Sequence, residues 1–255
     1  MAGHSHWAKV KRAKGVTDAR RGKLFSKLSK EITVAARLGG GDPGFNPRLR
    51  QAIATARAES VPVENIERAI KKGTGELEGA AYEEMIYEGY GPAGVAILVE
   101  AATDNKNRSA AEIRSLFAKN HGNLAGSGSV AWMFQHKGVI TISDAKVSED
   151  DVILAALDAG AEDVRTHDGI IEVITPSGAR LDTVVKALEA AKIPIGSAKQ
   201  TYLPGNTTPV ADAQVAEQVL ALLEALDDHE DVQNVHANLE MSPELYESAG
   251  KAASS

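Results

Sequence analysis

The sequence predicts an α+β protein of three domains: an N-terminal three-helix domain with a basic arm, a central α/β domain, and an inserted ferredoxin-like βαββαβ domain. Apolar residues recur at helical spacing through the first third of the chain, and the composition then becomes acidic with strand signals. A complete βαββαβ order follows, and the last helix and strand lack partners of their own. We therefore expect domains at residues 1–76, 77–136 with 204–240, and 137–203, followed by a tail at 241–255.

Three helices are expected in the first domain, after a polar and basic arm. The first runs from about Asp18 to Leu38, where leucine and isoleucine fall at helical spacing. Asn46 is a good N-cap, and the proline after it suits the first turn of a second helix. A third helix covers about residues 63–72, with Gly73 closing it.

The central domain is expected to begin with two antiparallel strands near residues 85–88 and 95–100, which flank a glycine-rich turn. Ser109 and Glu112 have the spacing of a capping box, so we expect a helix to start there. Residues 129–134 have the pattern of a further strand.

The inserted domain has the most regular pattern. Strands are expected at residues 139–142 and 195–203, with a first helix after Ser148 and a second near 181–188. Between the helices, Asp168-Gly169 indicates a tight hairpin. This order is that of the split βαβ unit.

The last two elements have no neighbours to pair with. A strongly amphipathic helix covers about residues 215–226, and a strand follows at 235–239. We infer that both pack with the strands of residues 80–136, which makes the segment between them an insertion. From Met241 the chain is expected to be frayed.

The charge distribution is the strongest functional signal. Residues 1–37 hold ten Lys and Arg against two acidic residues, a net charge of +8, whereas residues 76–255 carry −17. Such asymmetry points to a nucleic acid or a membrane surface as partner. The alternative is that the basic third docks on the acidic remainder of the chain.

We expect the arm and the first helix to grip a phosphate backbone, because Lys and Arg supply affinity for a polyanion. The arm's histidines and tryptophan add planes on which bases stack, although Trp7 has the alternative of packing on the helices. The candidate nucleic-acid-binding residues are His4, His6, Trp7, Lys9, Lys11, Arg12, Lys14, Arg20, Arg21, Lys23, Lys27 and Lys30.

Enzymatic motifs are missing, so we expect no catalytic site, no cofactor and no metal. There is no cysteine, no P-loop, no nucleophile elbow and no zinc-protease motif. The G-x-G-x-x-G match at Gly39 follows a helix instead of a strand, which indicates a loop. The acidic run at residues 227–231 is expected to be a solvated turn. No signal peptide or membrane-length apolar run is present, so we expect a cytoplasmic protein and no membrane partner.

Several stretches resemble the YebC/PmpR family. They include the opening Met-Ala-Gly-His-Ser-His-Trp-Ala-Lys, Asn65-Ile-Glu-Arg-Ala-Ile-Lys-Lys-Gly-Thr-Gly75, Thr103-Asp-Asn-Lys-Asn-Arg108 and Gly128-Ser-Val-Ala-Trp-Met-Phe134. The resemblance covers nearly the whole chain. It departs at Ala93, His121 and Ala125, where the family is expected to have glycine.

The resemblance implies a three-domain α+β protein that regulates transcription by binding DNA. It also implies an alternative, because relatives such as the mitochondrial translational activator of cytochrome oxidase subunit I act with the ribosome. In that case the chain would bind ribosomal RNA and assist elongation through difficult, proline-rich stretches. A protein partner that binds the acidic domains is compatible with either role. No catalytic residue is implied.

Overall fold

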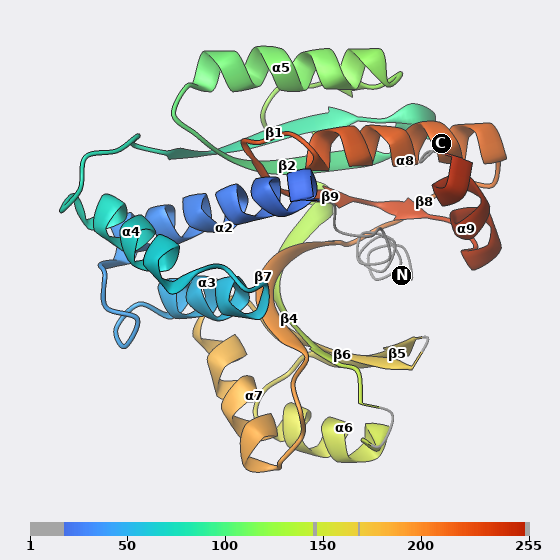
Figure 1. The fold of residues 1–255 in the computed structure, drawn as a ribbon. Coiled ribbons are helices and arrows are strands. Elements are labelled where there is room, and N and C mark those ends of the chain that lie inside the picture. The colour runs from blue at the N-terminus through green and yellow to red at the C-terminus, as the bar shows by residue number, and fades with distance from the viewer. Residues whose placement is uncertain (1–17, 145–146, 168, 253–255) are drawn as a thin grey trace. The chain divides into compact units, whose positions relative to one another are not determined.

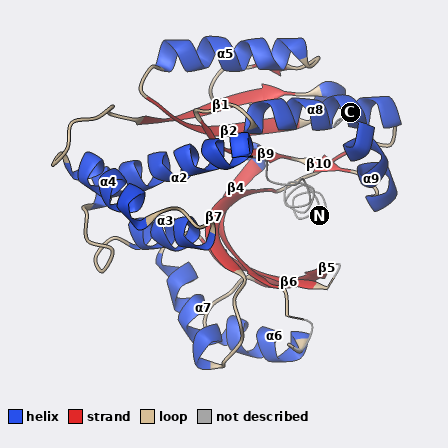
Figure 2. Ribbon diagram, in the orientation of Figure 1, coloured by secondary structure: helices blue, strands red, loops and turns tan. Residues whose placement is uncertain are grey.

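The computed structural model describes residues 18–144, 147–167 and 169–252. The chain combines helices with several β-sheets, and three helices come first in succession, which confirms the α+β class (Figures 1 and 2). The chain forms two compact units, one of residues 1–133 with 206–255 and one of residues 134–205. The predicted boundary at residue 76, between a helical and a central domain, stays a prediction. Within the described residues, no helix is both long and apolar enough to cross a membrane.

The first unit begins with the three predicted helices, α2 (Asp18–Gly39), α3 (Pro47–Ala58) and α4 (Val63–Thr74). They share a hydrophobic cluster of their own, to which each contributes: Ile32, Ala35, Ala36, Leu49, Ala52, Ile53, Ala56, Val61, Ile66 and Ala69. Asn46 caps α3 as predicted, since its side chain accepts the Leu49 N–H.

The predicted end of α4 at Gly73 is wrong. Gly73 lies inside the helix, and Gly75 ends it in the left-handed conformation, with φ of 82°. A Cβ atom on Gly73 would collide with the Thr33 carbonyl oxygen and the Ala36 Cβ atom. Glycine is therefore needed there because α4 crosses α2 closely, which a local sequence pattern does not reveal.

A four-stranded antiparallel sheet forms the centre of the first unit. Its order is β3-β1-β2-β9, with β1 at Glu83–Tyr90, β2 at Ala96–Thr103, β3 at Asn123–Leu124 and β9 at Val232–Ala237. Strand β9 pairs with β2, with Val235 opposite Val99. This confirms that the last strand returns to the early ones, whereas the predicted insertion of residues 137–203 as a separate domain stays a prediction.

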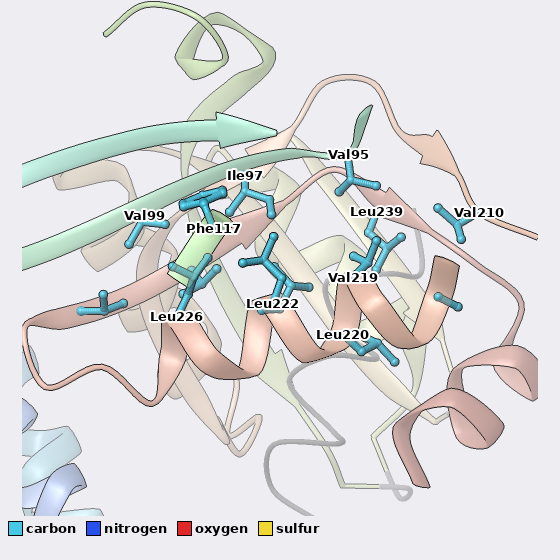
Figure 3. Close-up of a cluster of buried hydrophobic side chains, with 14 of the residues drawn as sticks. Val95, Ile97, Val99, Phe117, Val210, Val219, Leu220, Leu222, Leu226 and Leu239 are labelled. Atoms are coloured by element: carbon cyan, nitrogen blue, oxygen red, sulfur yellow. The ribbon is translucent and has the colours of Figure 1, made fainter. Parts of the chain in front are cut away.

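Two helices supply the core that covers one face of this sheet, α5 (Lys106–Lys119) and α8 (Ala213–Asp227). Figure 3 shows Phe117 of α5 and Leu222 and Leu226 of α8 directed at Ile97 and Val99 of β2. Alternate strand residues face this core, as expected for a sheet with one face packed on helices. A separate two-stranded parallel sheet is formed by β8 (Thr208–Pro209) and β10 (Leu239–Glu240), and β10 comes directly after β9 in the chain.

The second unit confirms the predicted order of elements. It comprises β4 (Phe134–Ile142), α6 (Glu149–Asp158), β5 (Asp163–His167), β6 (Ile170–Pro176), α7 (Ala179–Ala190) and β7 (Ser197–Pro204). The sheet order is β5-β6-β4-β7 and every pairing is antiparallel, which is the split βαβ arrangement. Both helices pack their apolar residues on one face of the sheet.

Two predictions in the central region are wrong. Helix α5 starts at Lys106 with Asn105 as its N-cap, so Ser109 and Glu112 form no capping box. Ser109 is instead a buried helical residue with long-range hydrogen bonds. Residues 129–133 form no strand, because a short 3₁₀ turn, η2 (Ala131–Met133), precedes β4, and only Phe134 of the predicted segment is in a strand.

The expected frayed tail is also a helix, α9 (Pro243–Ala252). Tyr246 is fully buried and Ala249 nearly so, and both belong to the core around α8. Burial of one aromatic ring stabilises a segment by about 1.5–3 kcal/mol, which accounts for the ordering of a stretch with weak sequence periodicity.

Ala93, His121 and Ala125 stand where the resembling family is expected to have glycine, and two of them adopt a backbone conformation that favours glycine. Ala93, in the turn η1 (Pro92–Gly94), has φ of 55°, and His121, after α5, has φ of 59°. Ala125 has no positive φ. The left-handed conformation costs a residue with a Cβ atom about 1–2 kcal/mol, so these two turns are locally strained.

We expect Ala93→Gly and His121→Gly each to raise the free energy of unfolding of the first unit by about 0.5–1 kcal/mol, because glycine adopts this conformation without steric cost. Urea denaturation measures the change. Ala125→Gly is the matched control and should bring no gain, since it only adds freedom to the unfolded chain. A gain for the control equal to the other two would contradict this explanation.

Candidate nucleic-acid interface

The predicted binding residues divide into two groups. His4, His6, Trp7, Lys9, Lys11, Arg12 and Lys14 lie outside the residues that the structure describes. The remaining five, Arg20, Arg21, Lys23, Lys27 and Lys30, belong to the first half of α2. The helix therefore brings the second group together, and their place in the nucleic-acid site stays a prediction.

Two sides of helix α2 make different contacts, one apolar and one basic. Ile32, Ala35 and Ala36 are buried in the helical cluster. Lys23, Lys27 and Lys30 are spaced four and three residues apart, which places their side chains along one stripe of the helix.

This lysine stripe contacts the acidic turn, residues 227–231, between α8 and β9. Lys30 Nζ lies 2.6 Å from Asp231 Oδ1 and donates to the Glu230 carbonyl oxygen at 3.0 Å. Lys27 donates to the Asp227 carbonyl oxygen, and its side chain is only 12% exposed. Lys23 is more open, with Nζ 3.7 Å from Asp228 Oδ2. The basic helix thus docks on the acidic turn, as the alternative interpretation of the charge asymmetry proposed.

Asp231 is the centre of this contact, so the prediction of a solvated turn is wrong at that residue. Its side chain is 1% exposed, and Oδ2 accepts hydrogen bonds from Ser109 Oγ at 2.7 Å and Arg108 Nη2 at 2.9 Å. Thr103 Oγ1 adds a longer contact at 3.2 Å. Three segments far apart in the sequence therefore meet at one carboxylate.

The environment of Asp231 keeps it ionised. Burial alone would raise the pKa of this carboxyl group, but hydrogen bonds from Lys30, Ser109 and Arg108 outweigh it and hold the pKa well below its usual range. A buried charge is tolerated only when it is paired and hydrogen-bonded, and both conditions are met here.

A histidine and a glutamate lie beside this network. His229 Nε2 is 2.9 Å from Glu112 Oε2, and its Nδ1 accepts the Asp231 N–H at 3.1 Å. Ligand atoms of these three residues lie within 4.8 Å of one another. A metal ion would have to compete with the two cations already on Asp231, so the donor set suits a structural network better than a metal site.

A second buried carboxylate organises the loop before η2. Glu88 of β1 is 4% exposed and accepts backbone N–H groups from Gly128, Val130 and Ala131 at 2.7–2.8 Å. Burial alone would raise the pKa of this carboxyl group. The hydrogen bonds from the backbone N–H groups lower the pKa by more than burial raises it, so the net shift is downward. The loop is therefore held in one conformation, and it leads into η2, whose Trp132 is 70% exposed.

Sequence reasoning missed both carboxylates. Asp231 was one of several acidic residues in a run, and Glu88 was one of several in a strand. Neither has a local signature, because their partners lie between 40 and 201 residues away. The one local signal was Ser109, which caps no helix in the structure, but its spacing from Glu112 favoured the interpretation as a helix cap.

Several surface cations of helices α2, α3 and α4 have no partner among the described residues. They are Arg21 of α2, Arg57 of α3, and Arg68, Lys71 and Lys72 of α4, all exposed. An anionic partner would meet these charges without displacing an internal contact. The lysine stripe would first have to leave the acidic turn.

Comparison with known proteins gives matches over almost the whole chain. A family model described as "TACO1/YebC protein N-terminal domain" matches residues 5–76, and one described as "TACO1/YebC second and third domain" matches residues 82–239. A "probable transcriptional regulatory protein" of Methylacidiphilum infernorum is 57% identical over 97% of this chain and 99% of its own length. A protein of the same description from Desulfotalea psychrophila is 54% identical, over 97% and 98%.

A solved structure shares the fold. The crystal structure of a conserved hypothetical protein from Aquifex aeolicus superposes with a TM-score of 0.81 at 49% sequence identity. The match covers 88% of this chain and 92% of that one.

We expect Asp231→Asn to lower the free energy of unfolding by about 3 kcal/mol, because it leaves Lys30 and Arg108 facing a neutral group in a buried site. The folded pKa lies below the unfolded value of about 3.9, so the stabilisation is present above about pH 4 and is lost as the pH falls further. The wild type should therefore lose stability in acid more steeply than the variant. Denaturation at a series of pH values measures this.

Asp104→Asn is the matched control, since Asp104 also pairs with Arg108 at 2.9 Å but is exposed. It should change stability far less than Asp231→Asn. Equal losses in the two variants would show that burial of Asp231 is not the cause.

Proposed function

We propose that this chain, which belongs to the TACO1/YebC family, is a regulatory protein that controls transcription by binding DNA. Its relatives are named as transcriptional regulators, which supports a regulatory role. The observation that carries the nucleic-acid part is the charge of +8 within residues 1–37 on a chain that is otherwise acidic. We take binding, not catalysis, to be its activity.

In this proposed function, the cations of the arm supply most of the affinity for the phosphates. Lys9, Lys11, Arg12 and Lys14 precede the helix, whereas Lys27 and Lys30 are occupied by the acidic turn. Each phosphate neutralised by a cation releases counterions, so the affinity depends steeply on salt. Such contacts supply affinity and orientation more than sequence preference.

We expect reversal of Lys9, Lys11, Arg12 and Lys14 to Glu to abolish binding of duplex DNA by the full-length chain, because four phosphate contacts become repulsive. Fluorescence anisotropy at several salt concentrations gives the affinity and the salt slope, and circular dichroism verifies folding. An RNA duplex and a single-stranded RNA, measured in parallel, reveal whether RNA is the preferred ligand instead.

The control reverses four exposed cations elsewhere, Arg114, Lys119, Lys186 and Lys192, with the same change in net charge. This variant should retain nearly all the binding, apart from a weak long-range effect that salt screens. Loss of binding in both variants would mean that net charge matters and the arm does not.

Within α2, we expect Arg21→Gln to weaken DNA binding and Lys27→Gln to act mainly on stability. Arg21 is exposed and has no partner among the described residues, whereas Lys27 holds the acidic turn. Removing one phosphate contact should reduce the salt slope by about 0.9. Affinity titrations and urea denaturation of both variants separate the two effects. The opposite assignment, with Lys27→Gln reducing the salt slope, would place the lysine stripe on the nucleic acid.

A further inference from the structure

The loop between α2 and α3 presents an aromatic ring to solvent. Phe45 is 88% exposed, the highest value among the exposed large apolar side chains of the described residues. In Figure 1 this loop joins the left end of α2 to the left end of α3 and projects beyond both. A phenylalanine so exposed gains nothing from the fold itself.

The loop is nevertheless rigid, because Asn46 anchors one end. Asn46 is 4% exposed, and its Nδ2 donates to the carbonyl oxygens of Ala35 and Gly40, both at 2.8 Å. Its Oδ1 accepts the Leu49 N–H at 3.0 Å. Every polar atom of this side chain is thus used to hold the loop on the helices.

Asp42 fixes the other side of the loop. Its carboxylate accepts the Gly44 N–H at 2.8 Å, and its carbonyl oxygen accepts the N–H groups of Phe45 and Asn46 at 3.2 and 3.0 Å. Arg50 Nη1 donates to the Pro43 carbonyl oxygen at 2.8 Å. The Phe45 backbone is therefore held in place before any partner arrives.

Cations surround this end of the helical cluster. Arg50 lies against the loop itself. A Cβ atom on Gly41 would lie 2.7 Å from Thr74 Cγ2 and 3.3 Å from Ile70 Cγ2, so the loop packs on the last turn of α4. That turn carries Lys71 and Lys72, both exposed and without a partner among the described residues.

Two of the acidic groups at this end are engaged within the protein. Asp42 caps the loop, and Glu76 accepts a hydrogen bond from Thr74 Oγ1 at 2.9 Å. An exposed ring on a fixed loop that packs on a helix with exposed cations suits a single-stranded nucleic acid, with bases on the ring and phosphates on the cations.

We propose that Phe45 stacks on an unpaired nucleobase while Lys71, Lys72 and Arg50 hold the flanking phosphates. This contact deepens the proposed function and rests on it, because it names unstacked nucleic acid as the ligand of a second site, away from the arm. The ligand chemistry, an aromatic base between phosphates, is common to single-stranded DNA and RNA.

The test uses the full-length chain and oligonucleotides of about 30 bases, long enough for several binding sites. Single-stranded DNA and RNA of the same sequence are titrated with the wild type, Phe45→Ala, Phe45→Leu, Phe45→Trp and Leu38→Ala. Leucine keeps the apolar volume but lacks the aromatic face. Leu38 is the matched control, since it is 62% exposed in the last turn of the neighbouring α2.

We expect Phe45→Ala and Phe45→Leu to weaken binding about 5- to 150-fold, and Phe45→Trp to retain it, because stacking needs a π-face. Leu38→Ala should have no effect. The salt slope should be unchanged by the Phe45 variants, whereas replacing Lys71 and Lys72 by Gln should lower it by about 0.7 for each phosphate that is no longer neutralised. The oligonucleotide whose affinity falls further identifies the natural ligand class.

Three results would overturn the contact. Full binding by Phe45→Leu would show that apolar volume suffices, and an equally weakened Leu38→Ala would indicate an apolar patch. Loss of binding to phosphatidylserine vesicles in Phe45→Ala, with unchanged oligonucleotide binding, would indicate a membrane. If the wild type binds neither these oligonucleotides nor duplex DNA, the proposed function fails with the contact. If it binds duplex DNA but no single strand, only the stacking contact fails. If the wild type binds and Phe45→Ala binds equally, only the stacking contact fails.

Discussion

One buried carboxylate joins the helical part of the first unit to its central sheet. Asp231, at the start of the last long strand, receives Lys30 from α2 and Arg108 with Ser109 from α5. Such a charge costs several kcal/mol to remove from water, and only good pairing compensates for it. The contact is therefore specific: a shift of α2 along its axis would leave Asp231 without its lysine. Because the two hydrophobic clusters are separate, polar contacts link the helices to the sheet, and the Asp231 network is the buried contact beside the exposed pair of Arg48 with Glu84.

This pairing changes the meaning of the charge asymmetry. The sequence places +8 within residues 1–37, and the structure shows that part of it neutralises the turn at 227–231. The two interpretations, internal docking and polyanion binding, are thus compatible, since different residues serve them. Among the described residues, the cations of α3 and α4 that lack a partner remain for an external anion. A net count of charge along the sequence merges these roles, because it contains no information on which side chains meet.

Features that depend on neighbouring residues could be predicted from the sequence, whereas features that depend on contacts between distant residues could not. Helix and strand periodicities are local, so most elements and the βαββαβ order were predicted correctly, as was the return of β9 to β2. Ser109 and Gly73 were misinterpreted because each has a local explanation, a cap or a helix end, that tertiary contacts override. The helix at 243–252 depends on burial of Tyr246 in a core assembled from distant segments. For the same reason Asp231 and Glu88 were invisible: their partners lie on other elements.

The loop at Phe45 shows the same limit from the functional side. The glycines and proline of residues 39–47 correctly predict a loop, and its match to a dinucleotide motif was correctly rejected. Flexibility would be the natural inference from such a composition, yet Asn46 and Asp42 make the loop rigid. Helix α2 spans 22 residues, about 33 Å, between the arm and this loop. In the proposed binding mode, the cations of the arm supply affinity, whereas the ring on its fixed loop would discriminate by geometry. A nucleic acid that meets both would be attracted at one end of α2 and oriented at the other.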